Sequence, residues 1–294
     1  MKNIQIRLFV VFLLAFLPVV VVAQDVDRET IIVPQVAAGW EGPANQQGSF
    51  RWVTDFQLIG SNLSAKEGKS LLKLLKSDGS SMVADILWAD GTRSVNASSL
   101  EVTLKPRLTL TGTVTACSSC GSQSLQTGAM ILQVPFSWSP QNYNYVDDVT
   151  AQVTYRRLDW QGNEQTSAGV AVGSLVNKFA VQAVLTGNVD SGLAMYNPDN
   201  KPATLKVNLF NAQSKSDPIQ PIATATVVLK AGEQKSQFFS QLFANLTADR
   251  QGNKATDGHV EVTSDVGIAV TALKCFFPAN GNFVIAGIPI LQVK

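Results

Sequence analysis

Two cysteines three positions apart form the sharpest chemical motif of the chain. Cys117-Ser118-Ser119-Cys120 has the Cys-x-x-Cys spacing of a redox pair or of half a zinc site. A redox motif of the thioredoxin type should open a helix, which Gly121-Ser122-Gln123-Ser124 does not favour. A zinc site needs four ligands, yet a second Cys pair is absent and His259 is the single histidine. We therefore predict a local disulfide between Cys117 and Cys120, with no metal and no cofactor.

The third cysteine and the histidine are isolated from each other and from other catalytic groups. Cys275 lies in the apolar run 268–277, where a cysteine usually behaves as a small buried hydrophobe. His259 alternates with Val260 and Val262, so we expect it to face solvent on a strand. No Gly-x-Ser-x-Gly nucleophile motif occurs in the sequence. The sequence thus predicts no catalytic residues and favours a protein that is not an enzyme.

A segment that mixes aromatic and amide side chains is the main candidate for ligand binding. Residues 136–145 read Phe-Ser-Trp-Ser-Pro-Gln-Asn-Tyr-Asn-Tyr. Aromatic faces offer contact area at low entropic cost, and amides donate and accept hydrogen bonds. We predict that Trp138, Tyr143 and Tyr145 bind a ligand, for which carbohydrate is one class. The alternative is that Phe136 and Trp138 belong to the core while the tyrosines edge a loop.

Two pairs of adjacent oxygen-bearing side chains are candidate calcium ligands. Asp147-Asp148 and Asp199-Asn200 could each contribute oxygen atoms to a calcium ion. Neither pair belongs to a spaced acidic loop, and turn chemistry explains both equally well. The sequence therefore predicts no metal site at either position.

The N-terminal sequence indicates export. Lys2 and Arg7 are followed by the apolar run 8–22, and Val21-Val22-Ala23 offers a small-residue cleavage site. We predict a signal peptide over residues 1–23; the alternative is an uncleaved anchor, although a membrane span needs about 20 apolar residues. Export would make the protein secreted, periplasmic or exposed at the cell surface, where disulfides persist.

Charge and length exclude some classes and allow two domains. The formal net charge of +1 creates no field that would favour nucleic acid or an anionic membrane. The 294 residues, less the leader, suffice for two domains of ordinary size. With three cysteines in the sequence, disulfides cannot be the main source of stability, so apolar cores must supply it.

Alternation of apolar and polar residues predicts an all-β fold. Residues 258–289 read as three strands, the last two joined by the hairpin signal Asn280-Gly281. Residues 31–36 read as a first strand, in which Pro34 favours a position at a sheet edge or a strand start. Residues 236–246 are the exception, because their apolar side chains form one helical stripe. That stripe consists of Phe239, Leu242, Phe243 and Leu246.

The same order of segments occurs twice along the chain. The matching pairs are 70–76 with 203–210, 100–104 with 225–229, 128–134 with 258–263, and 149–155 with 268–276. Two copies of one β unit would explain the length of the chain. We place the junction at residues 172–178 and predict a first domain over 24–175 and a second over 176–294.

The second half resembles the immunoglobulin-like β-sandwich repeat of secreted bacterial proteins. The resemblance lies in the Asn197-Pro198 turn, the Ala231-Gly232-Glu233 turn, the short helix and the closing Gly287-Ile288-Pro289. It covers residues 179–289 well and residues 31–171 more loosely. It implies two tandem Ig-like antiparallel β-sandwiches in an extracellular setting, with one short helix in the second, and it transfers no catalytic residues.

Together these features predict an exported, non-enzymatic protein with an adhesion, binding or spacer role at the cell envelope or outside the cell. Its partner would be an extracellular or envelope protein or a glycan, and not a nucleic acid. No membrane span is expected after the leader is removed. The alternative is a carbohydrate-binding module that uses the aromatic segment. A hydrolase is disfavoured because no acid–base constellation is present.

Overall fold

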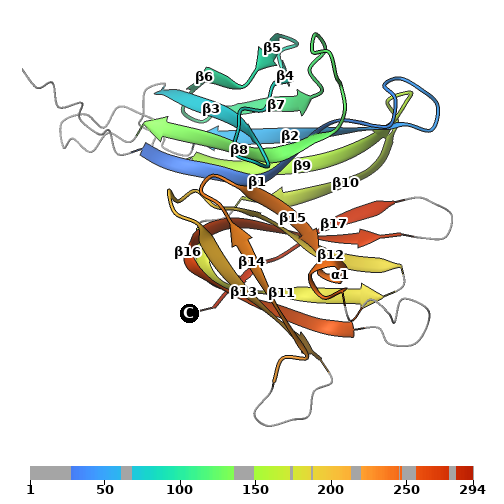
Figure 1. The fold of residues 1–294 in the computed structure, drawn as a ribbon. Coiled ribbons are helices and arrows are strands. Elements are labelled where there is room, and N and C mark those ends of the chain that lie inside the picture. The colour runs from blue at the N-terminus through green and yellow to red at the C-terminus, as the bar shows by residue number, and fades with distance from the viewer. Residues whose placement is uncertain are drawn as a thin grey trace, which may run out of the picture.

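A computed structural model describes residues 28–60, 68–135, 149–172, 175–186, 188–212, 220–244, 246, 256–277 and 283–293. Within these residues the fold is nearly all β, and its one α-helix is a single turn. The strands form two curled antiparallel sheets, which lie one above the other in Figure 1. The predicted all-β antiparallel fold class is confirmed at this level.

The first sheet has ten strands, coloured blue to yellow-green in Figure 1. Its strands follow the order β5-β4-β7-β2-β1-β8-β3-β6, with β9 paired to β2 and β10 paired to β9. The bounds are β1 Arg28–Glu41, β2 Phe50–Gly60, β3 Gly68–Lys76, β4 Ala84–Trp88, β5 Arg93–Ala97, β6 Ser99–Leu104, β7 Thr109–Thr115, β8 Gln126–Pro135, β9 Val149–Asp159 and β10 Glu164–Ala171.

The second sheet has eight strands in the order β14-β13-β16-β11-β12-β15. Strand β17 pairs with β16, β18 pairs with β11, and β16 also pairs with β12. The bounds are β11 Val176–Thr186, β12 Val189–Tyr196, β13 Ala203–Asn211, β14 Ala223–Leu229, β15 Gln234–Phe238, α1 Phe239–Leu242, β16 Thr256–Phe276, β17 Val284–Ile288 and β18 Leu291–Gln292.

The two sheets pair their strands in matching order. The path β6-β3-β8-β1 of the first corresponds to β14-β13-β16-β11 of the second, and β2-β7 corresponds to β12-β15. Strands β9 and β10 correspond to the later part of β16 and to β17. The register agrees as well, since Leu74 faces Met130 on one sheet and Leu209 faces Val260 on the other. Segments that repeat in sequence therefore occupy equivalent places.

Strand β16 differs from the prediction, which divided residues 258–276 into two strands. The structure has one continuous strand that changes partners along its length. Its first part pairs with β11 and β13, and its later part pairs with β12 and β17. Where the alternation lapses, the Asp265 carboxylate accepts a hydrogen bond from the Thr204 N–H at 2.8 Å. This side-chain contact extends the pairing of β13 with β16 one residue past Ser264.

Pro34 lies inside β1, where the strand is paired on one side among the described residues. β8 pairs with β1 on both sides of Pro34, whereas β2 pairs with β1 over Gly39–Glu41 alone, so the predicted edge position holds locally and the predicted strand start does not. The register of β1 against β8 shifts between Val33 and Val36. A bulge of this kind leaves a residue unpaired, so it tolerates a proline that has no N–H to donate.

The predicted helix is present but shorter than residues 236–246. Helix α1 follows directly on β15, and its first turn is closed by the Phe238 N–H, which donates to Gln241 Oε1 at 2.9 Å. All four apolar residues of the predicted stripe contact the core of the second sheet: Phe239, Leu242, Phe243 and Leu246. The described residues contain no helix with the length and apolar character needed to cross a membrane.

Each curled sheet encloses an apolar core, and the core of the first sheet also includes Cys275 and Ile285 of the second. Phe56, Leu72 and Leu74 are fully buried in the first, and Phe179 and Leu209 are fully buried in the second. Buried side chains alternate with less buried ones along the strands, as in β3 and β13. Burial of this apolar surface stabilises the fold by about 25 cal/mol for each Å² removed from water.

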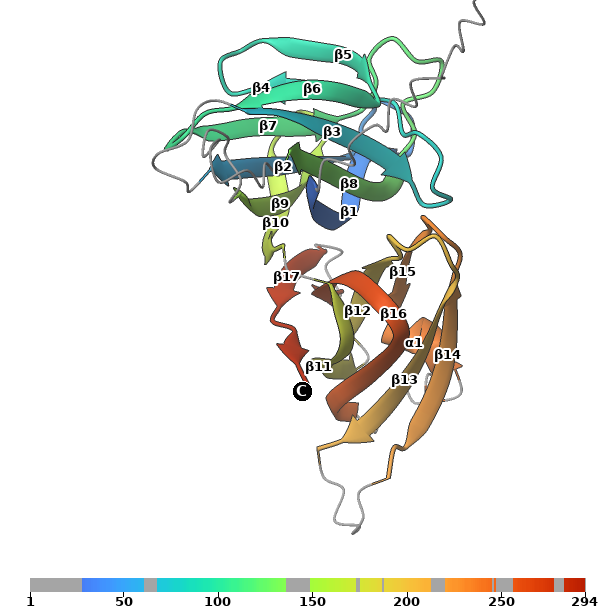
Figure 2. The same ribbon diagram turned by 90° about the vertical axis from the view of Figure 1, so that its left-hand side faces the viewer.

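The two sheets also pack against each other, as Figure 2 shows in a second orientation. Ile32 and Ala129 of the first sheet form an apolar cluster with Tyr196 and Ala269 of the second. Backbone groups bridge the sheets too, since the Gln234 N–H donates to the Ser77 carbonyl at 2.9 Å. These contacts hold the sheets in a defined arrangement and create the surface between them.

Candidate binding surfaces

Several predicted features lie outside the described residues. Trp138, Tyr143 and Tyr145 belong to this group, so the aromatic ligand-binding segment stays a prediction. The same holds for the signal peptide over 1–23 and for the Asn280-Gly281 hairpin signal. The candidate sites below are therefore built from other residues.

The two cysteines of the Cys-x-x-Cys motif are joined in a disulfide, with Cα atoms 5.4 Å apart. They lie in the loop between β7 and β8, beside Asn96, whose backbone φ of 56° is left-handed. Asn96 Oδ1 lies 2.8 Å from Cys117 Sγ and accepts a hydrogen bond from Ser119 Oγ at 2.6 Å. Because a disulfide sulfur carries no hydrogen, the first of these is a sulfur–oxygen contact.

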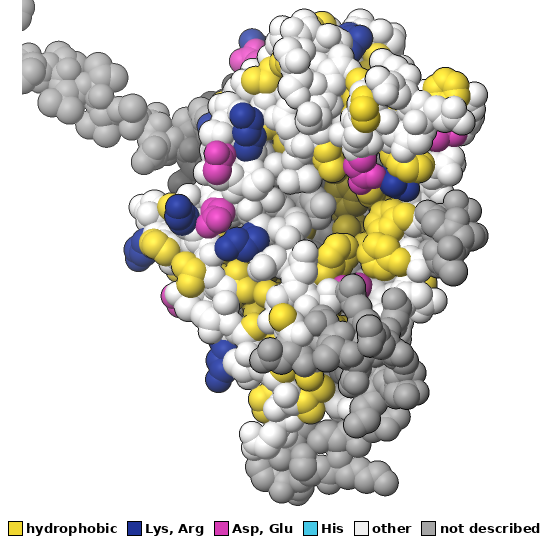
Figure 3. Space-filling view, turned by 45° about the vertical axis from the view of Figure 1, so that its right-hand side comes forward, with side chains coloured by type: hydrophobic (Ala, Val, Ile, Leu, Met, Phe, Trp, Pro, Cys, Tyr) yellow, Lys and Arg dark blue, Asp and Glu magenta, His cyan; other side chains and the backbone are white. Residues whose placement is uncertain are grey.

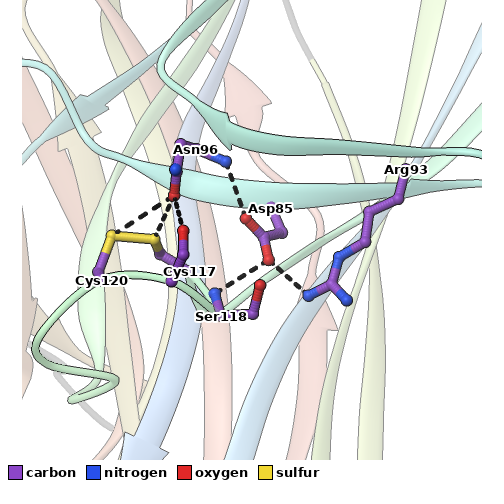
Figure 4. A network of polar contacts seen from close by, with 7 residues as sticks. Asp85, Arg93, Asn96, Cys117, Ser118 and Cys120 are labelled. Atoms are coloured by element: carbon purple, nitrogen blue, oxygen red, sulfur yellow. Dashed lines mark hydrogen bonds and ion pairs between the residues drawn. A yellow bond between two sulfur atoms is a disulfide. The ribbon is translucent and has the colours of Figure 1, made fainter.

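A buried carboxylate anchors this loop to the sheet. Asp85 accepts hydrogen bonds from Arg93 Nη2 at 2.5 Å, the Asn96 N–H at 2.9 Å and the Ser118 N–H at 2.9 Å, as Figure 4 shows. Burial opposes ionisation of Asp85, but the hydrogen bonds from Ser118, Asn96 and Arg93 outweigh it and lower the pKa of Asp85. The motif is thus a fixed structural element that connects β4, β5 and the disulfide loop.

Cys275 is a free, buried thiol, as the sequence predicted for a small hydrophobe. Burial, with a smaller contribution from the charge of Asp190, raises the pKa of Cys275 to about 12. The thiol is therefore protonated at neutral pH, and a thiol in that form is a poor nucleophile.

His259 is half-exposed and stacks on Phe210, with ring centroids 5.0 Å apart. Its Nε2 lies 3.6 Å from Glu261 Oε1, a pairing that needs a protonated imidazole.

Asp199 belongs to a turn, since its carboxylate accepts a hydrogen bond from the Lys201 N–H at 3.2 Å. Among the described residues, no group of three or more His, Cys, Asp or Glu side chains could hold a metal ion.

A cleft of about 340 Å³ lies between the two sheets. Figure 3 shows hydrophobic side chains gathered in this hollow, with charged groups at its rim. Aromatic rings follow one another along it: Trp52 lies 6.0 Å from Phe283, Phe283 lies 5.3 Å from Phe277, and Phe277 lies 6.1 Å from Phe238, between ring centroids.

One end of the cleft is polar. Glu41 accepts a hydrogen bond from Trp52 Nε1 at 2.5 Å and pairs with Arg157 at 2.9 Å. The Arg157 guanidinium carbon lies 3.5 Å from the Phe50 ring centroid, a cation–π contact. The Glu41–Arg157 ion pair fixes the orientation of Trp52. The apolar part of the cleft is therefore the part lined by Phe283, Phe277 and Phe238.

Strand β15 presents an open backbone edge along the cleft. The Gln234 N–H donates to the Ser77 carbonyl and the Phe238 N–H donates to Gln241 Oε1, both away from β12. In a strand, the backbone groups of residues two apart point to the same side. The Ser236 N–H and carbonyl, which lie between Gln234 and Phe238, therefore also point away from β12. Ser236 lines the cleft, as does Gln237, whose Oε1 is buried with no hydrogen-bond partner among the described residues. The cleft therefore combines an aromatic wall with unsatisfied hydrogen-bonding groups.

Sequence reasoning missed this cleft because its residues come from distant parts of the chain, from Gln35 to Ile285. One available signal was the pair of phenylalanines, Phe277 and Phe283, on either side of the Asn280-Gly281 hairpin signal. Both phenylalanines line the cleft.

Comparison with known proteins adds no assignment. No known family model matches the chain. No curated protein matches it either. The functional argument therefore depends on the geometry of this chain.

Proposed function

We propose that this chain is an exported, non-enzymatic binding protein made of two tandem Ig-like β-sandwiches, which acts in adhesion at the cell envelope or outside the cell. The inter-sheet cleft holds an extended, apolar segment of a partner protein. The apolar leader sequence supports export. The matching strand order of the two sheets supports a duplicated unit.

The observation that carries this function is the open edge of β15 inside an aromatic cleft. An extended segment that adds to such an edge gains main-chain hydrogen bonds, while pockets for alternate side chains select its sequence. The Ser236 N–H and carbonyl would pair with the added strand. Phe238, Phe277 and Phe283 would contact its apolar side chains.

The amide of Gln237 adds a polar requirement. Its Oε1 is buried without a hydrogen-bond donor, a state that costs about 1–3 kcal/mol. Rotation of this amide toward the cleft would let its Oε1 accept an N–H from the bound segment. The preferred segment is thus apolar on the side that meets the rings and has a free amide near Gln237.

Peptide selection on the purified full chain tests this function. Random peptides displayed on phage should enrich sequences in which apolar residues alternate with polar ones. Ser236→Pro should weaken these peptides about tenfold or more, because proline lacks the N–H and its ring obstructs an added strand. Ser236→Ala, which keeps the backbone groups, should change affinity less than about twofold.

Thermal melting of both variants provides the folding control, since the Ser236 N–H points away from β12 and its replacement removes no ladder bond. Equal peptide affinity in Ser236→Pro and Ser236→Ala would contradict strand addition at β15. Enrichment of peptides without apolar alternation would contradict it as well.

A further inference from the structure

A second hollow, of about 500 Å³, lies on the outer face of the first sheet and is separate from the cleft. Its floor crosses adjacent strands, since Val53 of β2 faces Arg156 of β9 and Thr115 of β7 faces Asp85 of β4. Ala116, Ser118 and Gln123 from the disulfide loop line it as well. The hollow is therefore built from the sheet and from the loop that Asp85 fixes.

Three arginine side chains gather in this hollow. Arg51, Arg93 and Arg156 line it, and none of the described residues that line it is an Asp or Glu. Arg93 is paired with Asp85, and Arg156 is held by Asp55 through Nε at 2.5 Å and Nη2 at 3.0 Å. The carboxylates of Asp85 and Asp55 therefore neutralise the charges of these two arginines.

Arg51 differs from the other two because no carboxylate of the described residues pairs with it. Its guanidinium carbon lies 5.6 Å from the centroid of the Trp40 ring, which orients the side chain. Its Nε is buried and donates to no described acceptor. Burial, and then the charge of Arg156, lowers the pKa of Arg51. An anion in the hollow would offset the repulsion between Arg51 and Arg156.

We propose that this hollow binds the oxyanion of an acidic, sugar-sized ligand, a carboxylate or sulfate group, with Arg51 as the main contact. The guanidinium group presents its donors in a planar fork that fits two oxygen atoms of such a group. Thr115 and Gln123 supply further donors at the wall of the hollow. The volume falls within the roughly 300–1,000 Å³ typical of small-molecule sites and exceeds what a bare ion needs.

Calorimetric titration of the purified full chain tests the proposal. Trigalacturonate and inorganic sulfate serve as anionic probes, and maltotriose is the neutral control. Arg51→Gln should weaken both anions about tenfold or more, since a hydrogen bond to a charged group is lost. Arg107→Gln is the matched control. It removes the same positive charge, but Arg107 is exposed and lies outside the hollow. It should change affinity less than about twofold.

A second variant keeps the proposal testable if Arg51→Gln fails to fold. Gln123→Glu is isosteric and places a carboxylate in the wall, so it should also weaken both anions about tenfold. If trigalacturonate binds more tightly than sulfate, the ligand is an acidic saccharide. If sulfate binds more tightly, the hollow is a site for a free ion. Absence of anion binding by the wild type would overturn the proposal. Equal losses in Arg51→Gln and Arg107→Gln, or equal affinity for maltotriose, would overturn it too.

Discussion

The two sheets share one strand order but differ in what is attached to it. The first carries the β4–β5 hairpin, the disulfide loop and the arginine hollow. The second carries helix α1 and the continuous strand β16, whose two parts correspond to the separate strands β8 and β9. The hollow itself lies on shared strands, since Arg51 belongs to β2 and Arg156 to β9, while the disulfide loop completes its wall. A duplicated β unit can acquire a site without changes to its core.

Equivalent glycines show how closely the two units match. Gly128 of β8 and Gly258 of β16 lie at corresponding positions, opposite Lys76 and Asn211. A Cβ at Gly128 would overlap the Leu75 carbonyl, and one at Gly258 would overlap the Phe210 carbonyl. In both sheets the neighbouring strand approaches too closely for any side chain.

The largest expected effect therefore comes from alanine at these two glycines. Gly128→Ala and Gly258→Ala should each destabilise the protein by about 3 kcal/mol, because a rigid backbone must shift. Urea denaturation followed by circular dichroism measures the change. Gly121→Ala is the control, since nothing lies within 4 Å of its added Cβ. A large cost at one glycine and none at the other would break the equivalence of the sheets.

Removal of the disulfide should affect one sheet and spare the other. Cys117→Ser combined with Cys120→Ser should cost about 2 kcal/mol, the loop-closure value for so short a loop. Hydrogen exchange should show lost protection in β4, β5 and β7 with little change in β13 and β16. Reductant should destabilise the wild type and leave the double variant unchanged. Equal loss of protection in both sheets would contradict a local role for the disulfide.

The smallest expected effect concerns the pH dependence that Asp85 gives to the first sheet. Folding lowers the pKa of Asp85, so its carboxylate stabilises the fold fully above the ordinary Asp pKa of about 3.9. That contribution is lost as the pH falls through the lower value of the folded state. Because Arg93 is half-exposed, we expect Asp85→Asn to cost about 1 kcal/mol at pH 7. Urea denaturation should show this difference shrink below about pH 4, and a difference independent of pH would contradict the assignment.

Much of the fold could be predicted from local patterns. Sequence repetition paired residues 70–76 with residues 203–210, and both segments are strands in the structure. Prediction failed where a long-range contact overrides the local pattern. The bulge at Pro34 forms against β8, and β16 continues into a part that pairs with β12. Neither partner is close in sequence.

The sequence by itself determined the strands, the short helix and the repetition, because each of these depends on the period of neighbouring residues. Tertiary structure alone decided the cleft and the hollow. Trp52 meets Phe283 across the inter-sheet cleft, and Arg51 lies beside Trp40 in a hollow shared with Arg93 and Arg156. Such groupings arise from strand register and from the packing of one sheet on another, so no local pattern encodes them.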